Sequence, residues 1–269
     1  MNAILFKQMM KVNMKTFMNY AFGSAFYTLI MFWIYPSIGK NVAEIDALVA
    51  AMPEGIMRAF SLSGFGSAEA FISGEYYGLI LVLLLAIVIV QLSTQLVAKL
   101  VDQGSMAYLL STPTTRTKVA LTQAVVLVAG LFMIMAVTAL AGFAGNAWFL
   151  RGEYEFNTAR FIEINAAAFL LFFAVGGITF LVSSVSNDEK RALGISGFIT
   201  FGFFSLDLIG KFSDKIEWMR DISFFSLYRP GEIIEGTVNL GLSFTILAAI
   251  GLVTFALAVF LFRRRDLPL

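Results

Sequence analysis

Six stretches of this chain are long and apolar enough to cross a lipid bilayer, and they constrain the fold more than any motif does. A helix needs about 20 mostly apolar residues to cross, because backbone polar groups in hydrocarbon must pair within the segment. The stretches cover residues 17–35, 78–98, 119–143, 161–185, 192–209 and 238–262. They lack the short alternating segments of an outer-membrane barrel. The sequence therefore predicts an all-α membrane protein with six transmembrane helices in a single domain, residues 1–269.

The composition agrees with this fold class and limits the chemistry of the chain. Hydrophobic residues make up 59% of the 269 residues and charged residues 14%, whereas soluble domains have about 45–50% and about 25%. The net charge of +1 gives no support for nucleic-acid binding. The chain has no Cys and no His, so it lacks thiolate ligands and the commonest general base and metal ligand.

The chain also lacks G-x-x-x-x-G-K-[ST], the loop that holds nucleotide phosphates in P-loop proteins. We therefore expect that it is not an enzyme and carries no cofactor or metal. If it takes part in active transport, ATP and Mg²⁺ must be bound by a separate polypeptide.

The distribution of Lys and Arg predicts the orientation. Eleven of the 19 basic residues fall in the segments on one side of the predicted membrane and eight on the other. The eleven lie close to the ends of the spans, where the positive-inside rule has most weight. They are Lys7, Lys11, Lys15, Lys99, Arg116, Lys118, Lys190, Arg191, Arg263, Arg264 and Arg265. This predicts a multi-pass membrane protein with both termini in the cytoplasm.

Lysines recur every four residues before the first span, at Lys7, Lys11 and Lys15. This spacing forms one basic ridge on a helix that also carries apolar residues. We expect an N-terminal interfacial helix that lies on the inner leaflet, with its lysines toward anionic lipid head groups. A frayed positive flank of the first span is the alternative.

Two outer segments, residues 36–77 and 211–237, are long for simple connections. The first contains a helical pattern, with Ile56, Met57 and Phe60 as its apolar residues. It fits either a surface helix or a folded loop. The second is rich in aromatic residues and is broken at Pro230 and Gly231. It fits either an interfacial anchor or a re-entrant segment, and re-entrant backbone needs protein or water to satisfy its polar groups.

The most conspicuous polar loop between two apolar stretches covers residues 99–118. Asp102 and Ser105 are candidate helix N-caps and Gly104 a tight turn, while Pro113 disfavours helix at the preceding residue. Between these residues, Met106, Leu109 and Leu110 form an apolar stripe at i, i+3 and i+4. A helix this short is unstable alone, so we expect the stripe to pack against a partner protein or against the headgroup region of the membrane.

The run D-Q-G-S-M-A-Y-L-L-S-T-P-T-T-R in this loop resembles the corresponding loop of ABC-2-type exporter permeases. M-P-E-G-I-M-R-A-F in the first outer segment and F-R-R-R-D-L near the C-terminus match that family too. The chain departs from it at Val101-Asp102-Gln103, where the family often clusters Glu. The family positions in the loop are occupied by Asp102, Gly104, Ser105, Leu109, Leu110, Pro113 and Arg116.

The resemblance implies that the loop contains a cytosolic coupling helix between spans 2 and 3, which docks into a groove on a cytosolic ABC ATPase. It implies two ATPase copies, a second permease copy or paralogue, and a location in the cytoplasmic membrane of a bacterium. Met106, Leu109 and Leu110 would be the docking stripe. The expected substrate is apolar or amphipathic, such as a drug, an antimicrobial or hydrophobic peptide, or a lipid-like molecule. A passive channel or a membrane assembly factor is the alternative function.

Polar side chains also lie within the second predicted span, near its inner end. Gln91 and Gln95 are one helical turn apart, and Thr94 lies beside them. Polar groups in a bilayer bind other helices or line a watery path. These three residues are therefore candidates for either a helix interface or a translocation pathway.

Overall fold

The computed structural model describes residues 1–59 and 67–266, which form helices, turns and loops and no strand. Six helical runs in this part of the chain are long and apolar enough to cross a membrane, which confirms the predicted all-α membrane fold. Five predicted stretches lie inside these runs, and the sixth begins two residues before its helix. The runs are Ala3–Gly39, Ala68–Asp102, Arg116–Leu150, Thr158–Val185, Glu189–Gly210 and Leu240–Arg264.

Several of these runs consist of more than one element. The second contains α4 (Ala68–Ile72), the π-helix η1 (Ser73–Ile80), α5 (Leu81–Leu96) and α6 (Ala98–Asp102). The third contains α8 (Arg116–Gly145) and η2 (Asn146–Leu150). The first, fourth, fifth and sixth are α1, α9, α10 and α13. The short elements are α2 (Val42–Ala50), α3 (Glu54–Ala59), α7 (Ser105–Leu110), η3 (Asp214–Ile216), α11 (Trp218–Ile222), η4 (Phe224–Leu227) and α12 (Pro230–Glu235).

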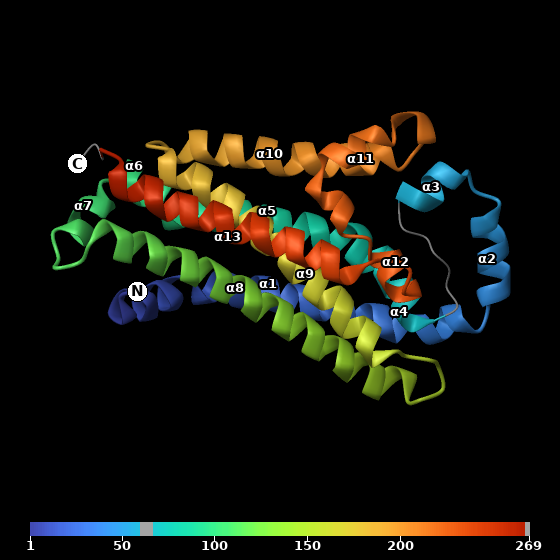
Figure 1. The fold of residues 1–269 in the computed structure, drawn as a ribbon. Coiled ribbons are helices and arrows are strands. Elements are labelled where there is room, and N and C mark those ends of the chain that lie inside the picture. The colour runs from blue at the N-terminus through green and yellow to red at the C-terminus, as the bar shows by residue number, and fades with distance from the viewer. Residues whose placement is uncertain (60–66, 267–269) are drawn as a thin grey trace.

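The long helices form one elongated bundle (Figure 1). Both termini, α6 and α7 lie at one end, which we name the inner end, and α2, α3, α4 and α12 lie at the opposite, outer end. The second run and α9 are at the centre, since 67% and 61% of their most apolar windows are buried. The same fraction is 22% for α10 and for α13, which are peripheral.

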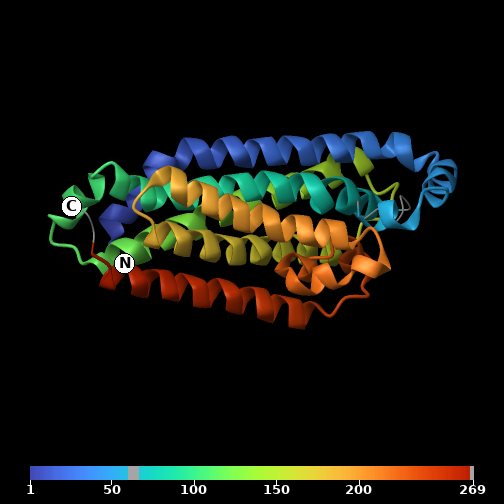
Figure 2. The same ribbon diagram turned by 90° about the horizontal axis from the view of Figure 1, so that it is seen from above.

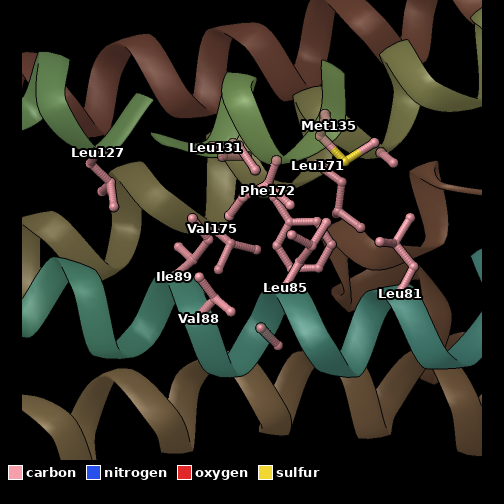
Figure 3. Packing of buried hydrophobic residues seen from close by; sticks show 14 of the residues in the cluster. Leu81, Leu85, Val88, Ile89, Leu127, Leu131, Met135, Leu171, Phe172 and Val175 are labelled. Atoms are coloured by element: carbon pink, nitrogen blue, oxygen red, sulfur yellow. The ribbon is translucent and has the colours of Figure 1, made fainter. Parts of the chain in front are cut away.

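The centre of the bundle is a cluster of aliphatic and aromatic side chains where α5, α8 and α9 meet (Figure 3). Leu85 and Val88 of α5, Leu131 of α8, and Leu171 and Phe172 of α9 are almost completely inaccessible to solvent. In a bilayer the lipid tails are as apolar as this cluster, so close van der Waals packing holds the helices together.

Glycines allow the closest approach between helices. A Cβ atom on Gly177 of α9 would lie 2.9 Å from the backbone oxygen of Gly251 of α13, so only small residues fit this crossing. Along α1 and α8, the ring of Phe17 packs over Gly130 and that of Phe32 over Gly145. The sequence contains too many glycines in its apolar stretches to identify these crossings in advance.

The N-terminal segment differs from the prediction, because no break separates an interfacial helix from the first span. Helix α1 is continuous from Ala3 to Gly39, and its 37 residues extend for about 55 Å, well beyond the hydrocarbon thickness of about 30 Å. Asn2 contacts Thr122 and Phe17 contacts Gly130. Between these two contacts the N-terminal segment advances by 15 residues, whereas α8 advances by only eight. The first turns of α1 therefore cross the inner end obliquely, as Figure 2 also shows.

The two long outer segments adopt different structures. Helix α4 and η1 extend the second span outward to Ala68, ten residues before its predicted start. Helix α11 lies against α10, with Trp218 and Ile222 exposed, whereas Phe225, Tyr228 and Pro230 of the following segment are buried in the bundle. The apolar pattern predicted for the first segment ends at Phe60, which lies outside the described residues.

Candidate functional site

The inner loop between the second and third spans contains the short helix that the sequence predicts. Helix α7 covers Ser105–Leu110 and follows Gly104, whose φ of +69° lies in the left-handed region that favours glycine. Neither Asp102 nor Ser105 caps α7. Gly104 occupies the N-cap position, and it has no side chain that could accept a hydrogen bond from the first turn. Thr115 instead caps α8, its hydroxyl accepting a hydrogen bond from the Lys118 N–H at 3.3 Å.

The apolar stripe of α7 faces the bundle, and its role in docking stays a prediction. Met106 is completely buried and belongs to the hydrophobic core. Leu109 and Leu110 are half-buried and pack against that core. The bundle therefore supplies the packing surface that a helix this short needs in order to be stable.

The opposite side of α7 is open to solvent. Tyr108 is 80% exposed, and Ser111, Thr112 and Pro113 after the helix are exposed as well. We name these four residues the α7 tip. The exposure of Tyr108 could have been predicted from the sequence, because Tyr108 cannot share a helical face with residues 106, 109 and 110.

The beginning of the loop is bonded to the start of α10, which follows the turn of residues 186–188 after α9. The Asp102 carboxylate accepts a hydrogen bond from the Glu189 N–H at 3.2 Å, so it caps the start of α10 and not the start of α7. Lys99 and Glu189 form an ion pair at 3.4 Å. Asp188 caps α10 from within the turn by accepting from the Arg191 N–H at 2.6 Å.

The end of the loop is bonded to the same turn through the C-terminal segment. Arg116 donates a hydrogen bond to the backbone oxygen of Arg265 at 2.5 Å. The Arg265 guanidinium in turn donates to the backbone oxygens of Ser184 at 2.7 Å and Ser186 at 2.8 Å. These oxygens lie in the last turn of α9 and at its C-cap, where the helix leaves carbonyls without partners and the dipole favours a cation.

The N-terminus also contacts the end of the loop. The Asn2 backbone N–H donates to the Thr122 hydroxyl at 2.9 Å, and its side chain donates to the Thr114 hydroxyl at 3.0 Å. Segments that are distant in sequence therefore converge on residues 99–118. Sequence reasoning used Arg265 only for the orientation and as part of the C-terminal F-R-R-R-D-L match, and it did not single out Asn2.

The three polar candidates of the second span occupy different environments. The Thr94 hydroxyl is buried and donates to the Val90 backbone oxygen of its own helix at 2.9 Å. Gln91 is exposed and its side-chain oxygen lies 3.4 Å from the Tyr20 hydroxyl of α1, which donates to it. Gln95 is half-buried. A polar contact between helices is made instead by Ser93, whose hydroxyl lies 2.7 Å from that of Thr179.

Gln91 and Gln95 belong to a stripe of accessible positions that recurs every fourth residue along η1 and α5. Ile87 and Gln91 are exposed, and the other members are half-buried. We name it the α5 stripe: Glu75, Leu79, Leu83, Ile87, Gln91 and Gln95. Helix α5 lies between α1 and α10 (Figure 2).

Residues 1–59 and 67–266 contain no group of three or more acidic side chains that could hold a metal ion. Comparison with protein families gives one informative result. The family model described as ABC-2 family transporter protein matches residues 21–267, which is nearly the whole chain. A search of curated proteins finds no match to the chain.

Proposed function

Because this chain belongs to the ABC-2 transporter family and is thus the membrane permease component of an ABC transporter, we propose that it exports an apolar or amphipathic substrate from a bacterial cell. In this proposal two permease copies assemble with two cytosolic ATPase subunits, which bind ATP and Mg²⁺. The inner end of the bundle faces the cytoplasm, where the basic residues close to span ends favour that orientation.

The observation that carries the proposal is the construction of the inner loop. The α7 tip is exposed, while the base of α7 is packed through Met106 into the core. A short helix anchored in this way moves with the bundle and presents Tyr108 to a partner. Aromatic side chains are enriched at protein interfaces because they bury a large area at low entropic cost. We therefore assign ATPase docking to the α7 tip.

The bonds at the inner end supply a route from that tip to the transmembrane helices. Asp102 holds the first turn of α10, and Arg265 holds the last turn of α9. Displacement of residues 99–118 by the ATPase would therefore move the turn between these helices. Helix α10 is the natural element to respond, because it is peripheral and little buried.

The polar residues on accessible faces of the spans favour a second permease copy. Asn19 of α1, Gln91 of α5 and Ser205 of α10 are exposed on apolar helices. Polar side chains in a bilayer rarely face lipid and more often face a protein neighbour or a water-filled path. We propose that the pathway forms where the faces of α1, α5 and α10 of two copies meet.

Capture of the ATPase tests the docking assignment. The permease is co-expressed with a candidate ATPase and purified through a tag on the permease. Tyr108→Ala combined with Thr112→Asp is expected to lower the amount of captured ATPase at least tenfold. The matched control is Thr158→Asp, because Thr158 is exposed at the opposite end of the bundle. Undiminished capture by the tip variant would reject the assignment.

The passive channel and the assembly factor are distinguished by transport in lipid vesicles. An exporter moves its substrate only with ATP and the ATPase present. Substrate movement that continues unchanged without either component would favour the passive channel. Absence of transport together with capture of unrelated membrane subunits would favour the assembly factor.

A further inference from the structure

The α5 stripe is polar at both ends and apolar in the middle. Gln91 and Gln95 lie at its inner end, Leu79, Leu83 and Ile87 in the middle, and Glu75 at its outer end. The helical stretch from Glu75 to Gln95 extends for about 30 Å, which equals the hydrocarbon thickness of a bilayer. The stripe therefore offers an accessible surface of changing polarity across the whole membrane.

Glu75 is the only ionisable residue of the stripe. It is half-buried and forms no ion pair with a side chain that the structure describes. Three other half-buried or buried carboxylates at this end form ion pairs: Asp207 with Lys211 and Arg220, Glu163 with Arg160, and Glu232 with Arg229. The buried Glu69 accepts a hydrogen bond from the Asn157 N–H at 2.9 Å and is not on the accessible stripe. An unpaired carboxylate beside apolar surface is costly, and a cation that neutralises it recovers that cost.

Tyrosines of α1 lie beside both ends of the stripe. The Tyr20 hydroxyl contacts Gln91 at 3.4 Å. The ring of Tyr27 stacks on that of Tyr76, next to Glu75 in the chain, with 5.0 Å between centroids. Tyr20 and Tyr27 are half-buried, so parts of both remain accessible. Aromatic faces attract organic cations, most strongly where water is partly excluded.

We propose that the α5 stripe binds cationic amphiphiles, with Glu75 pairing with the positive group and Leu79, Leu83 and Ile87 contacting the apolar part. This inference deepens the proposed function, since it specifies the substrate class of the permease. An anionic amphiphile would place its charge against the Glu75 carboxylate, and like charges in partly buried surroundings repel strongly. The stripe thus discriminates by charge and tolerates variation in apolar shape.

Binding to the full-length chain tests this inference without requiring ATP. The protein, with any subunits that remain bound, is placed in nanodiscs of neutral lipid. Tetraphenylphosphonium and tetraphenylborate serve as probes, because they match in size and differ in sign of charge. Equilibrium dialysis measures each probe, and binding to empty nanodiscs is subtracted.

Glu75→Gln is expected to weaken tetraphenylphosphonium binding about tenfold, which is the effect of losing one partly buried charge pair. The same change is expected to strengthen tetraphenylborate binding, because the charge that repels the anion is removed. Glu75→Asp keeps the charge and is expected to retain at least half of the affinity. Glu155→Gln is the matched control, because Glu155 is exposed in the loop before α9 and is not part of the stripe. Size-exclusion elution of each variant confirms that the fold is intact.

Three results would overturn the inference: no saturable binding of tetraphenylphosphonium to the wild type, equal binding to wild type and Glu75→Gln, or loss of both probes together. Dissociation of a dimer in Glu75→Gln with unchanged tetraphenylphosphonium affinity would assign the carboxylate to contact between two copies. These outcomes are independent of ATPase capture by the α7 tip. Failure of the substrate class therefore leaves the permease assignment untouched, and failed capture leaves the binding result valid.

Discussion

The two ends of the bundle are held together in different ways. At the inner end, charged side chains bond to backbone groups of distant segments: Asp102 to the start of α10, Arg265 to the end of α9, and Arg116 to Arg265. At the outer end, ion pairs such as that of Asp207 with Lys211 join nearby residues, and neutral hydroxyls and rings are buried between distant segments. Tyr77 donates to the Asn165 side chain at 2.9 Å, and Tyr228 donates to the Tyr77 backbone oxygen at 3.1 Å.

This difference separates a movable end from a rigid end. The inner contacts are few, partly exposed and joined to segments that a partner could displace. The outer contacts combine hydrogen bonds with close ring packing, and Tyr76 and Tyr77 are completely buried. Buried polar networks of this kind are costly to open, because each separated group loses its partner without gaining water. We expect motion to begin at the inner end while the outer cluster stays assembled.

The largest expected effect is loss of stability from Tyr77→Ala. The substitution removes a buried ring and leaves the Asn165 oxygen without its donor. The cost is about 3–5 kcal/mol, typical of replacing a buried aromatic residue with alanine. Thermal unfolding of the purified protein in detergent, followed by tryptophan fluorescence, measures it. Trp218→Ala is the control, because Trp218 is 56% exposed and its loss should change stability little. Similar stability of both variants would contradict a rigid outer end.

The second prediction concerns the inner end. It separates the coupling of the ATPase to transport from the folding of the permease. Arg265→Ala removes both hydrogen bonds to the last turn of α9. We expect ATP-driven transport in vesicles to fall about tenfold, which corresponds to about 1.4 kcal/mol, the size of one hydrogen bond to a charged group. Capture of the ATPase should not change, since the α7 tip is intact.

Arg263→Ala is the matched control for that experiment, because Arg263 is exposed and lies in the same cluster of three arginines. Equal transport by the two variants would show that the charge of the cluster matters and the specific bonds of Arg265 do not. If Arg265→Ala lowered thermal stability as much as Tyr77→Ala does, the inner end would be as rigid as the outer end and the distinction between them would be wrong.

The helices of the fold could be predicted because each rests on a local apolar pattern. Residues 119–143 and 161–185, for example, need no partner to identify them as spans, since bilayer thickness alone sets their length. The oblique start of α1 could not be predicted in the same way. Its direction depends on contacts between Asn2 and residues more than a hundred positions away, which sequence pattern does not encode.

The candidate site shows the same limit at the level of single residues. The stripe of Met106, Leu109 and Leu110 is a correct helical pattern, but periodicity gives only a face and not the surface that covers it. The structure places this face against the bundle. Asp102 likewise has the chemistry of a helix cap, and it caps α10 and not the helix that follows it in sequence. In both cases the residue types predicted the kind of contact, apolar packing for the stripe and helix capping for Asp102. Which surface or helix each one contacts was decided by tertiary packing.

The smallest expected effect comes from Lys99→Met, and it tests which inner contact matters. The Lys99 side chain is 37% exposed and that of Glu189 is 30% exposed, at a separation of 3.4 Å. Such pairs contribute about 0–1 kcal/mol, since water and salt screen them. We expect transport by Lys99→Met to stay within about twofold of wild type.

Asp102→Ala should lower transport more, because it leaves the Glu189 N–H at the start of α10 without its acceptor. Transport assays of both variants at low and high salt compare them directly. A larger loss in Lys99→Met than in Asp102→Ala, and greatest at low salt, would assign the connection between the inner loop and α10 to the ion pair instead of the cap.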